Sequence, residues 1–374
     1  MAIHIEEVNP KSLKPFIKFP FKLYKGNPYY VPPIIDFEVS TLSPKKNPAF
    51  KHCEARYWIA KDGENIVGRI AGIIHSKELE EKSLMRIGWI DFIDDLEVSK
   101  LLFDTAIAWG ESKGATGAHG PLGFTDLDFE GLLIEGFDII ASQATIYNYP
   151  YYKDHFEQYG FEKACDWVEI HGALQGIPDK LIRMYQKITE RYGLTNKKFK
   201  RNRDMLKYAD QVFDILNQTY SDLYGYYPLS TEQIQYYIKL YFGFIIKEYV
   251  SILVNEMDEV VAFAISMPSL SKAFQKAKGK LYPFGFIHIL KAFYFGNHVD
   301  LFLIGVRPKY QRLGANALMF HDMQKACLAN GVNWVSTGPM METNSGVLNL
   351  WNAYDENLKQ AVRRRCFIKK FDNE

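Results

Sequence analysis

The 374-residue sequence lacks the marks of several large protein classes. Its four cysteines form no Cys-x-x-Cys pair, and its nine histidines show neither HxxxH nor HExxH spacing. We therefore expect neither a disulfide framework nor a metal site. The net charge of +1 gives no general attraction to nucleic acid. The sequence also has no P-loop and no three-glycine dinucleotide fingerprint, which argues against those two classes.

Long apolar runs are also missing. No run approaches the roughly 18 residues that a membrane-spanning helix needs. The nearest is FGFIHILKAFYFG, residues 284–296, which we interpret as a core helix or a lid over the reacting group, with a surface for a partner or lipid as the alternative. The first residues, MAIHIEEVNPKSLKPF, contain no apolar h-region, so we expect no secretory signal and a cytoplasmic location.

The chain is longer than one hydrophobic core usually supports, which favours two domains. Each half contains a hairpin, a strand, a helix, a second strand, a Gly-Pro pair, a later helix and a final strand. The two Gly-Pro pairs are Gly120-Pro121 and Gly338-Pro339. This repetition indicates a diverged duplication. We predict a mixed α/β fold with two similar domains, residues 1–180 and 190–374, each a twisted mixed sheet flanked by helices.

One corner in the second half is suited to an anion. The apolar run 300–306 predicts a central strand buried on both faces, and a helix is predicted to begin near Ala315. Between them, Gly314 and Ala315 keep the side chains small, so backbone N–H groups at the helix N-terminus can approach a phosphate. Gln311 and Arg312 add polar and cationic groups. The alternative is a turn that only permits tight strand–helix packing.

The stretch Gln311-Arg312-Leu313-Gly314-Ala315 resembles the coenzyme A signature of the GNAT acetyltransferase superfamily. The resemblance implies tandem GNAT-like domains and an N-acyltransferase that uses acetyl-CoA or another acyl-CoA as substrate. Asn316 stands where the family usually has Gly or Ala. The coenzyme-binding residues that the resemblance implies are Ile304, Gly305, Val306, Gln311, Arg312, Leu313, Gly314, Ala315, Asn316, Ala317 and Asn344.

The same resemblance implies two catalytic candidates. Asp300 holds the position at which histone-type members have a glutamate, so it would take the proton of the attacking amine directly or through water. The alternative is a polar strand end at the surface. The family's tyrosine acid follows the asparagine by seven residues, where this chain has Trp351; Tyr354 lies one turn beyond. The implied reaction is direct attack of an amine on the thioester. The acceptor would be an amine on a small molecule, a peptide or a protein.

The first half resembles the fold without the coenzyme motif. Its segment 147–161, YNYPYYKDHFEQYGF, is similar to the GNAT segment that ends in Gly-Phe. At its strand-to-helix corner, however, Asp94 and Asp95 stand where the phosphate cradle would be, and they would repel a pyrophosphate. We therefore expect this half to shape the acceptor site or to be structural. His119, before Gly120-Pro121, is interpreted as a solvent-facing or hydrogen-bonded loop histidine in preference to a catalytic one.

Two other functions remain open from the sequence. The first is a Fem-type aminoacyl or peptidyl transferase that takes aminoacyl-tRNA, for which the basic segment 196–204, NKKFKRNRD, would supply RNA contacts. The weak net charge argues against it. The second is a non-catalytic module that binds CoA or a partner protein, which the tryptophan at position 351 favours.

Overall fold

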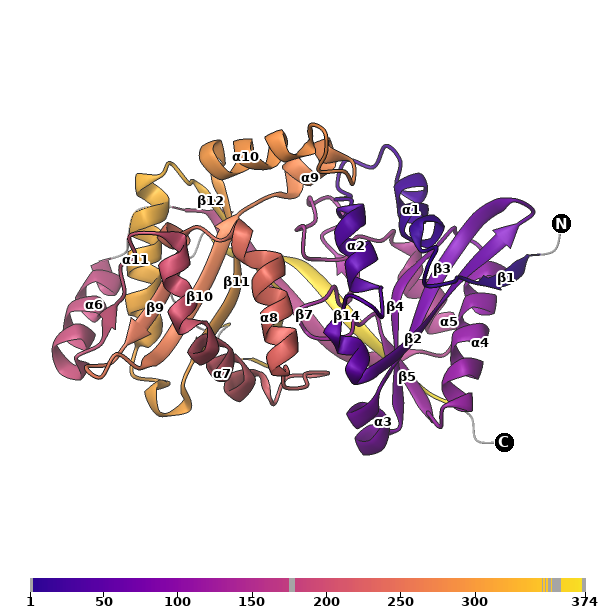
Figure 1. Ribbon diagram of the computed structural model, residues 1–374, viewed down its shortest axis with the longest axis horizontal. Helices are drawn as coiled ribbons and strands as arrows, with labels where there is room; N and C mark the ends of the chain where they lie inside the picture. Colours follow the sequence, from indigo (N-terminus) through magenta and orange to yellow (C-terminus); the bar gives the residue numbers. More distant parts are fainter. Residues whose placement is uncertain are drawn as a thin grey trace. The chain divides into compact units, whose positions relative to one another are not determined.

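The computed structural model describes residues 3–174, 179–344, 346, 348, 351 and 358–371. The chain forms two compact units. Unit 1 comprises Met1–Trp167, Leu270–Leu290 and Val362–Glu374, and unit 2 comprises Val168–Ser269 and Lys291–Ala361. Both are mixed α/β structures, as predicted, and Figure 1 shows their helices and strands.

The division differs from the continuous ranges that the sequence suggested. Leu270–Leu290 and Val362–Glu374 belong to unit 1 although they come late in the chain. Backbone pairing explains this for the last strand, because Phe367 pairs with Gly120 and Lys370 with Gly117 in antiparallel register. For the earlier segment, Ile35 donates its backbone N–H to the carbonyl of Gly279 at 3.0 Å.

Unit 1 is built on the strand order β1-β2-β3-β4-β5-β14, with β6 paired to β14. The strands are β1 (His4–Glu7), β2 (Cys53–Asp62), β3 (Asn65–His75), β4 (Leu84–Phe92), β5 (Gly117–Gly120), β6 (Leu132–Glu135) and β14 (Lys359–Lys370). Its helices are α1 (Lys14–Leu23), α2 (Ile35–Thr41), α3 (Ser76–Lys82), α4 (Leu96–Ser112), α5 (Tyr151–Gln158) and α9 (Ser271–Ala277). The hairpin expected in the first half of the chain is present as β2–β3, which are joined by a turn at Gly63.

Unit 2 follows the strand order β12-β11-β10-β9-β8, and the end of β7 (Glu162–Ala173) pairs with β12. The strands are β8 (Thr195–Asn196), β9 (Val250–Val254), β10 (Val260–Pro268), β11 (His298–Val306), β12 (Trp334–Thr337) and β13 (Met340–Met341). The helices are α6 (Asp179–Tyr192), α7 (Ala209–Tyr220), α8 (Thr231–Tyr241) and α11 (Ala315–Ala329); α10 (Gly285–Phe295) begins in unit 1. β11 and β12 pair in parallel, whereas β10 pairs antiparallel with both β9 and β11.

Two expectations are corrected by burial. The strand 300–306 is not buried on both faces, because Leu301–Ile304 and Val306 are half-exposed. Residues 284–296 are not a core helix, since Phe284 is 69 % exposed and Phe295 is 80 % exposed. Within the described ranges, none of the helices combines the length and the apolar character that a bilayer crossing needs.

Candidate functional site

The backbone of the predicted corner turns through two left-handed residues. β11 ends at Val306, a short 3-10 turn covers Pro308–Tyr310, and α11 begins at Ala315. Arg312 has φ +63° and Gly314 has φ +86°. Glycine adopts the left-handed region without steric cost, so the sequence places it where the chain needs it.

The N-terminus of α11 is left uncapped. Its N-cap residue is Gly314, which has no side chain to accept an N–H, and the first turn contains no acidic residue. No group in the described part of the chain accepts the backbone N–H of Arg312, Gly314, Ala315 or Asn316, whereas Ala317 donates to the carbonyl of Gly314 at 2.8 Å. Unpaired amides and the positive end of a 15-residue helix together favour an anion here.

The adjoining end of β11 is open along one edge. β12 pairs with β11 only from His298 to Leu301. Farther along, Arg307 donates its N–H to the carbonyl of Val261 on β10, so alternation turns the amides of Val306 and Ile304 away from β10. No strand among the described residues pairs with that edge beyond Leu301. It can therefore accept an extended ligand that carries amide groups.

Side chains already satisfy the carbonyls on this edge. The Tyr220 hydroxyl donates to the carbonyl of Ile304 at 3.2 Å, and Gln311 Nε2 donates to the carbonyl of Val306 at 3.1 Å. Gln311 thus closes the turn back on the strand, which gives the signature glutamine a structural part in the corner. Arg312 is exposed, and no carboxylate in the described ranges forms an ion pair with its guanidinium.

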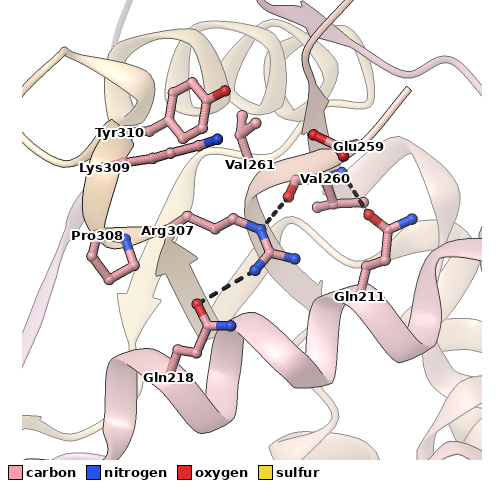
Figure 2. A pocket seen from close by; sticks show the side chains of 9 residues that line it. All are labelled: Gln211, Gln218, Glu259, Val260, Val261, Arg307, Pro308, Lys309 and Tyr310. Carbon is pink, nitrogen blue, oxygen red and sulfur yellow. Dashed lines mark hydrogen bonds between the residues drawn. The ribbon is translucent and has the colours of Figure 1, made fainter. Parts of the chain in front are cut away.

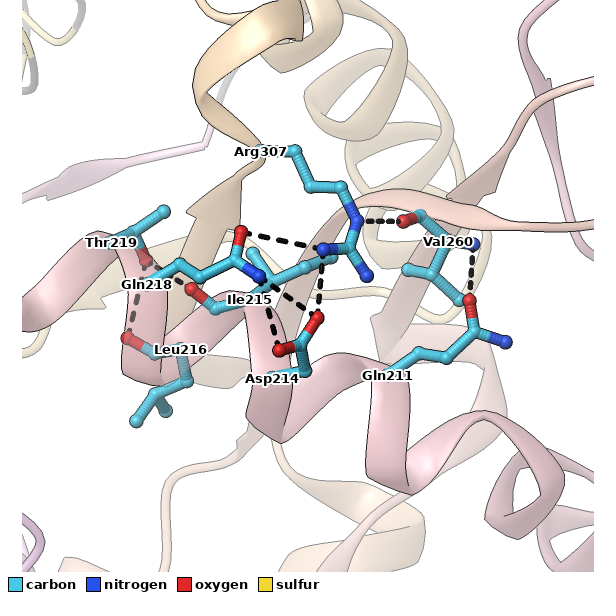
Figure 3. A network of polar contacts seen from close by, with 8 residues as sticks. All are labelled: Gln211, Asp214, Ile215, Leu216, Gln218, Thr219, Val260 and Arg307. Atoms are coloured by element: carbon cyan, nitrogen blue, oxygen red, sulfur yellow. Dashed lines mark hydrogen bonds and ion pairs between the residues drawn. The ribbon is translucent and has the colours of Figure 1, made fainter. Parts of the chain in front are cut away.

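A polar pocket of about 540 Å³ lies beside the corner. Figure 2 shows its lining side chains, which come from α7, the start of β10 and the residues after β11. Arg307 projects into its centre, where Nε donates to the carbonyl of Val260 at 2.7 Å. The guanidinium also pairs with Asp214 of α7 at 2.8 Å, as Figure 3 shows. Arg307 therefore fixes the end of β11 to α7 and β10.

The remaining residues of the predicted coenzyme site have separate surroundings. Gly305 serves packing, since a Cβ there would lie 2.7 Å from a ring carbon of Phe263. Leu313 is half-buried in the turn. Asn344 follows β13 and donates its backbone N–H to the carbonyl of Met341 at 2.9 Å. Tyr354, the predicted acid, lies outside the described residues.

Trp351 belongs to the core of unit 2. It is 6 % exposed, and its ring lies 4.8 Å from that of Phe320 on α11. Its place in the sequence corresponds to the family's tyrosine acid, but an indole in this environment has no acidic proton to give to a thiolate.

Asp300 forms a polar cluster that the sequence did not reveal. Its side chain is buried, with Oδ1 3.2 Å from Nε2 of His298. The same Nε2 lies 2.8 Å from the hydroxyl of Ser336 on β12. The other carboxylate oxygen, Oδ2, is buried and has no hydrogen-bond partner in the described part of the chain. A buried carboxylate oxygen without a donor is able to accept a proton or a hydrogen bond from a ligand.

Cross-strand register extends this polar row. Ser336 pairs with Asp300 on one side and with His171 of β7 on the other, so the three side chains share a face. His171 Nε2 lies 3.4 Å from Oε2 of Glu169, two residues away on the same strand. The His-x-Asp spacing at 298 and 300 was the one sequence signal for this cluster, because residues two apart on a strand face the same side.

The corresponding corner of unit 1 is closed by its own side chain. Asp95 is the N-cap of α4 and accepts the backbone N–H of Glu97 at 2.8 Å and of Val98 at 3.4 Å. Asp94 lies 3.0 Å from Nε2 of the buried His155. The carboxylates of Asp94 and Asp95 thus stand where an anion would bind, and Asp95 already accepts the backbone N–H groups that an anion would need.

Two other candidate functional features, His119 and the basic segment 196–204, make ionic contacts within the protein. His119 lies on β5 and not in a loop, and at 1 % exposure it does not face solvent. Its Nε2 lies 3.3 Å from Glu78, which also pairs with Arg86, and burial lowers the pKa of His119. In the basic segment 196–204, Lys197 and Lys198 pair with Asp258 and Asp322. These pairs neutralise part of the charge that RNA contacts would use.

Two curated proteins are similar in sequence to most of this chain. No protein-family model matches the chain. It is 29 % identical to Protein YghO of Escherichia coli (strain K12), over 92 % of this chain and 89 % of that one. It is 27 % identical to the bacterial ceramide synthase of Caulobacter vibrioides (strain NA1000 / CB15N), over 91 % of each chain.

A solved structure carries the fold assignment. The chain superposes on the tandem GNAT protein from the clavulanic acid biosynthesis pathway with a TM-score of 0.60, at 9 % identity and over 100 % of both chains. At this identity the likeness concerns the backbone arrangement, and it matches the two mixed α/β units described above. The chain therefore has the fold of a tandem GNAT protein.

Proposed function

We propose that this protein is an acyl-CoA-dependent N-acyltransferase whose unit 2 binds the coenzyme at the β11–α11 corner. One observation carries the proposal: among the described residues, the uncapped N-terminus of α11 adjoins an edge of β11 with which no strand pairs beyond Leu301. Coenzyme A contains a pyrophosphate joined to an arm that carries amide groups. The N-terminus of α11 offers N–H donors to the pyrophosphate, and the edge of β11 offers N–H donors to the arm. Unit 1 would shape the acceptor site without binding coenzyme, since Asp95 caps the equivalent helix.

The corner would hold the coenzyme through its backbone. The free N–H groups of Arg312 and of Gly314 to Asn316 would donate to the pyrophosphate, with the Arg312 guanidinium as counter-charge. The N–H groups of Ile304 and Val306 would donate to the pantetheine carbonyls, as a neighbouring strand would. The half-exposed apolar side chains of Leu301–Ile304 would then contact the arm and the acyl chain.

The Asp300 cluster would accept the proton that the amine nitrogen loses in the reaction. The amine nitrogen attacks the thioester carbonyl and forms the new C–N bond, and a β11 backbone N–H stabilises the oxyanion. Asp300, alone or through His298, takes the proton that the nitrogen loses. The C–S bond then breaks, and this proton ends on the coenzyme sulfur, so the products are an amide and free CoA.

For the acceptor, we propose a long-chain amino alcohol. The relative of 27 % identity is named a ceramide synthase, and a ceramide is the amide of a fatty acid with such an amine. That relative matches over 91 % of each chain, so both units are included in the likeness. The apolar side chains left half-exposed on β11 support a long acyl donor and an apolar acceptor.

The test has two stages. Isothermal titration calorimetry with acetyl-CoA, desulfo-CoA and ADP should give one site per chain, with ADP retaining much of the affinity. Release of free thiol from palmitoyl-CoA should then require sphinganine and should not occur with spermidine or a lysine peptide. No binding of any coenzyme would overturn the corner assignment. Turnover on the hydrophilic amines alone would overturn the proposed acceptor while leaving the coenzyme site intact.

A non-catalytic coenzyme-binding protein is the second candidate. It is favoured by Trp351, whose indole packs into the core where the family's tyrosine acid would stand. Stoichiometric binding without thiol release on any amine would support this candidate.

A further inference from the structure

The segment around α9 and α10 in unit 1 exposes a group of large apolar side chains. We define the apolar–basic surface as the exposed residues Tyr282, Phe284, Phe286, Ile287 and Leu290, together with the exposed lysines Lys272, Lys276, Lys278 and Lys280. Tyr282 is 77 % exposed and Phe284 is 69 % exposed. Large contiguous apolar surface is uncommon on soluble proteins and marks a contact surface.

Buried side chains and hydrogen bonds attach this segment to the rest of unit 1. Ala273, Phe274 and Ala277 of α9 are buried, as are Gly285 and Ile289 of α10. Gln275 Nε2 donates to the carbonyls of Pro28 at 2.8 Å and Tyr30 at 3.0 Å. The first half of α10 therefore has a buried inner side at Gly285 and Ile289, and its outer side carries exposed aromatic and aliphatic side chains.

The charge along this segment of the sequence has one sign. Four exposed lysines precede α10, and Lys291 within it is exposed as well. No aspartate or glutamate occurs between Glu259 and Asp300 in the sequence. In a chain whose net charge is only +1, such a separation is a local feature and does not follow from the overall composition.

We propose that the apolar–basic surface docks on the surface of a lipid bilayer that carries anionic headgroups. Exposed aromatic and aliphatic side chains enter the boundary between headgroups and acyl chains, while the neighbouring lysines pair with lipid phosphates. A second copy of this chain fits less well, because a two-fold interface would bring the lysine clusters together. The surface lies on the bilayer and does not cross it.

Vesicle flotation tests the proposal on the whole 374-residue chain. The wild type should float with vesicles of phosphatidylglycerol and phosphatidylcholine, and at least about 10-fold less with phosphatidylcholine alone. Phe284→Ser with Leu290→Ser should lower binding to the anionic vesicles at least about 10-fold. Lys278→Glu with Lys280→Glu should abolish the preference for anionic lipid. The control is Met257→Ser, which removes a side chain 74 % exposed on the β9–β10 turn and should bind as the wild type does.

Circular dichroism of each variant checks the fold, since the replaced side chains are exposed. Absence of wild-type flotation overturns the proposal. Equal flotation with neutral vesicles overturns the role of the lysines. A wild-type dimer that Phe284→Ser converts to a monomer, without vesicle binding, assigns the surface to self-association instead. The assay contains neither acyl-CoA nor amine, so its outcome is independent of the proposed activity.

Discussion

Asp95 accepts the backbone N–H of Glu97 at 2.8 Å, and this contact closes the N-terminus of α4. At the equivalent corner of unit 2, Gly314 provides no such acceptor, and the first amides of α11 are left without one in the described ranges. The two units thus share a strand-to-helix corner but differ in what satisfies its donors. In unit 1 the protein does so itself, and in unit 2 the donors are available to a ligand.

Gly314→Glu should weaken acetyl-CoA binding at least about 100-fold, because it places a carboxylate beside the pyrophosphate, where like charges cost several kcal/mol. The matched control is Gly331→Glu, at the other end of α11. Gly331 has φ +74°, and a Cβ there would meet nothing within 4 Å. Both variants carry a backbone strain of about 1–2 kcal/mol, so their stabilities should be similar.

Calorimetry should separate the two variants, since only the change at residue 314 touches the proposed cradle. If both lose affinity equally, strain in α11 would explain the loss. Normal affinity in Gly314→Glu would show that the corner is a packing turn.

Asp95→Ala should destabilise unit 1 by about 1 kcal/mol, because it removes the N-cap acceptor of α4. It should not create a second coenzyme site, since Asp94 and Glu97 keep the corner acidic. Urea unfolding measures the first effect and titration stoichiometry the second. A stoichiometry of two in the wild type would contradict our interpretation of unit 1.

Local features of the sequence predicted the corner well. Gln311 to Ala315 are neighbours in the chain, and the left-handed turn at Gly314 follows from that glycine. The Asp300 cluster was only half visible, because Ser336 joins it through the register of β11 and β12, which no local pattern fixes. That Val362–Glu374 belongs to unit 1 depends likewise on which strand β14 pairs with, and no local pattern in the sequence fixes that choice. The exposure of Phe284 could not be predicted from an apolar run, since a core helix has the same composition.

Stability at low pH should depend on the buried Glu78–Arg86 pair, whose charged atoms lie 2.6 Å apart. Burial alone would raise the pKa of Glu78, but the positive charge of Arg86 and the hydrogen bond from His119 outweigh it and lower the pKa to about 2. Since the pKa is lower in the folded state than the ordinary value near 4.3, ionised Glu78 stabilises the fold above about pH 4. This contribution, about 3 kcal/mol, should be lost between about pH 5 and pH 2.

Urea unfolding at several pH values measures this dependence. Glu78→Gln should flatten the acid limb and lower the stability at pH 7, because Arg86 is left as an unpaired buried charge. The control is Lys100→Ala, which removes an exposed ion pair with Asp104 and should change neither the acid limb nor the stability at pH 7. An unchanged acid limb in Glu78→Gln would assign the pH dependence to other carboxyl groups.

Asp300→Asn should lower kcat about 100-fold and leave the affinity for acetyl-CoA unchanged, because the amide keeps the shape of the side chain but cannot take a proton. His298→Gln should lower kcat less if His298 only orients Asp300, whose Oδ1 lies 3.2 Å from its Nε2. Raising the pH should partly restore the rate of Asp300→Asn, since a larger fraction of the amine is then unprotonated in solution. The control is Asp322→Asn, a carboxyl on α11 that pairs with Lys198. Wild-type turnover in Asp300→Asn would remove this residue from the chemistry, and loss of coenzyme binding would instead make it a structural support of β11.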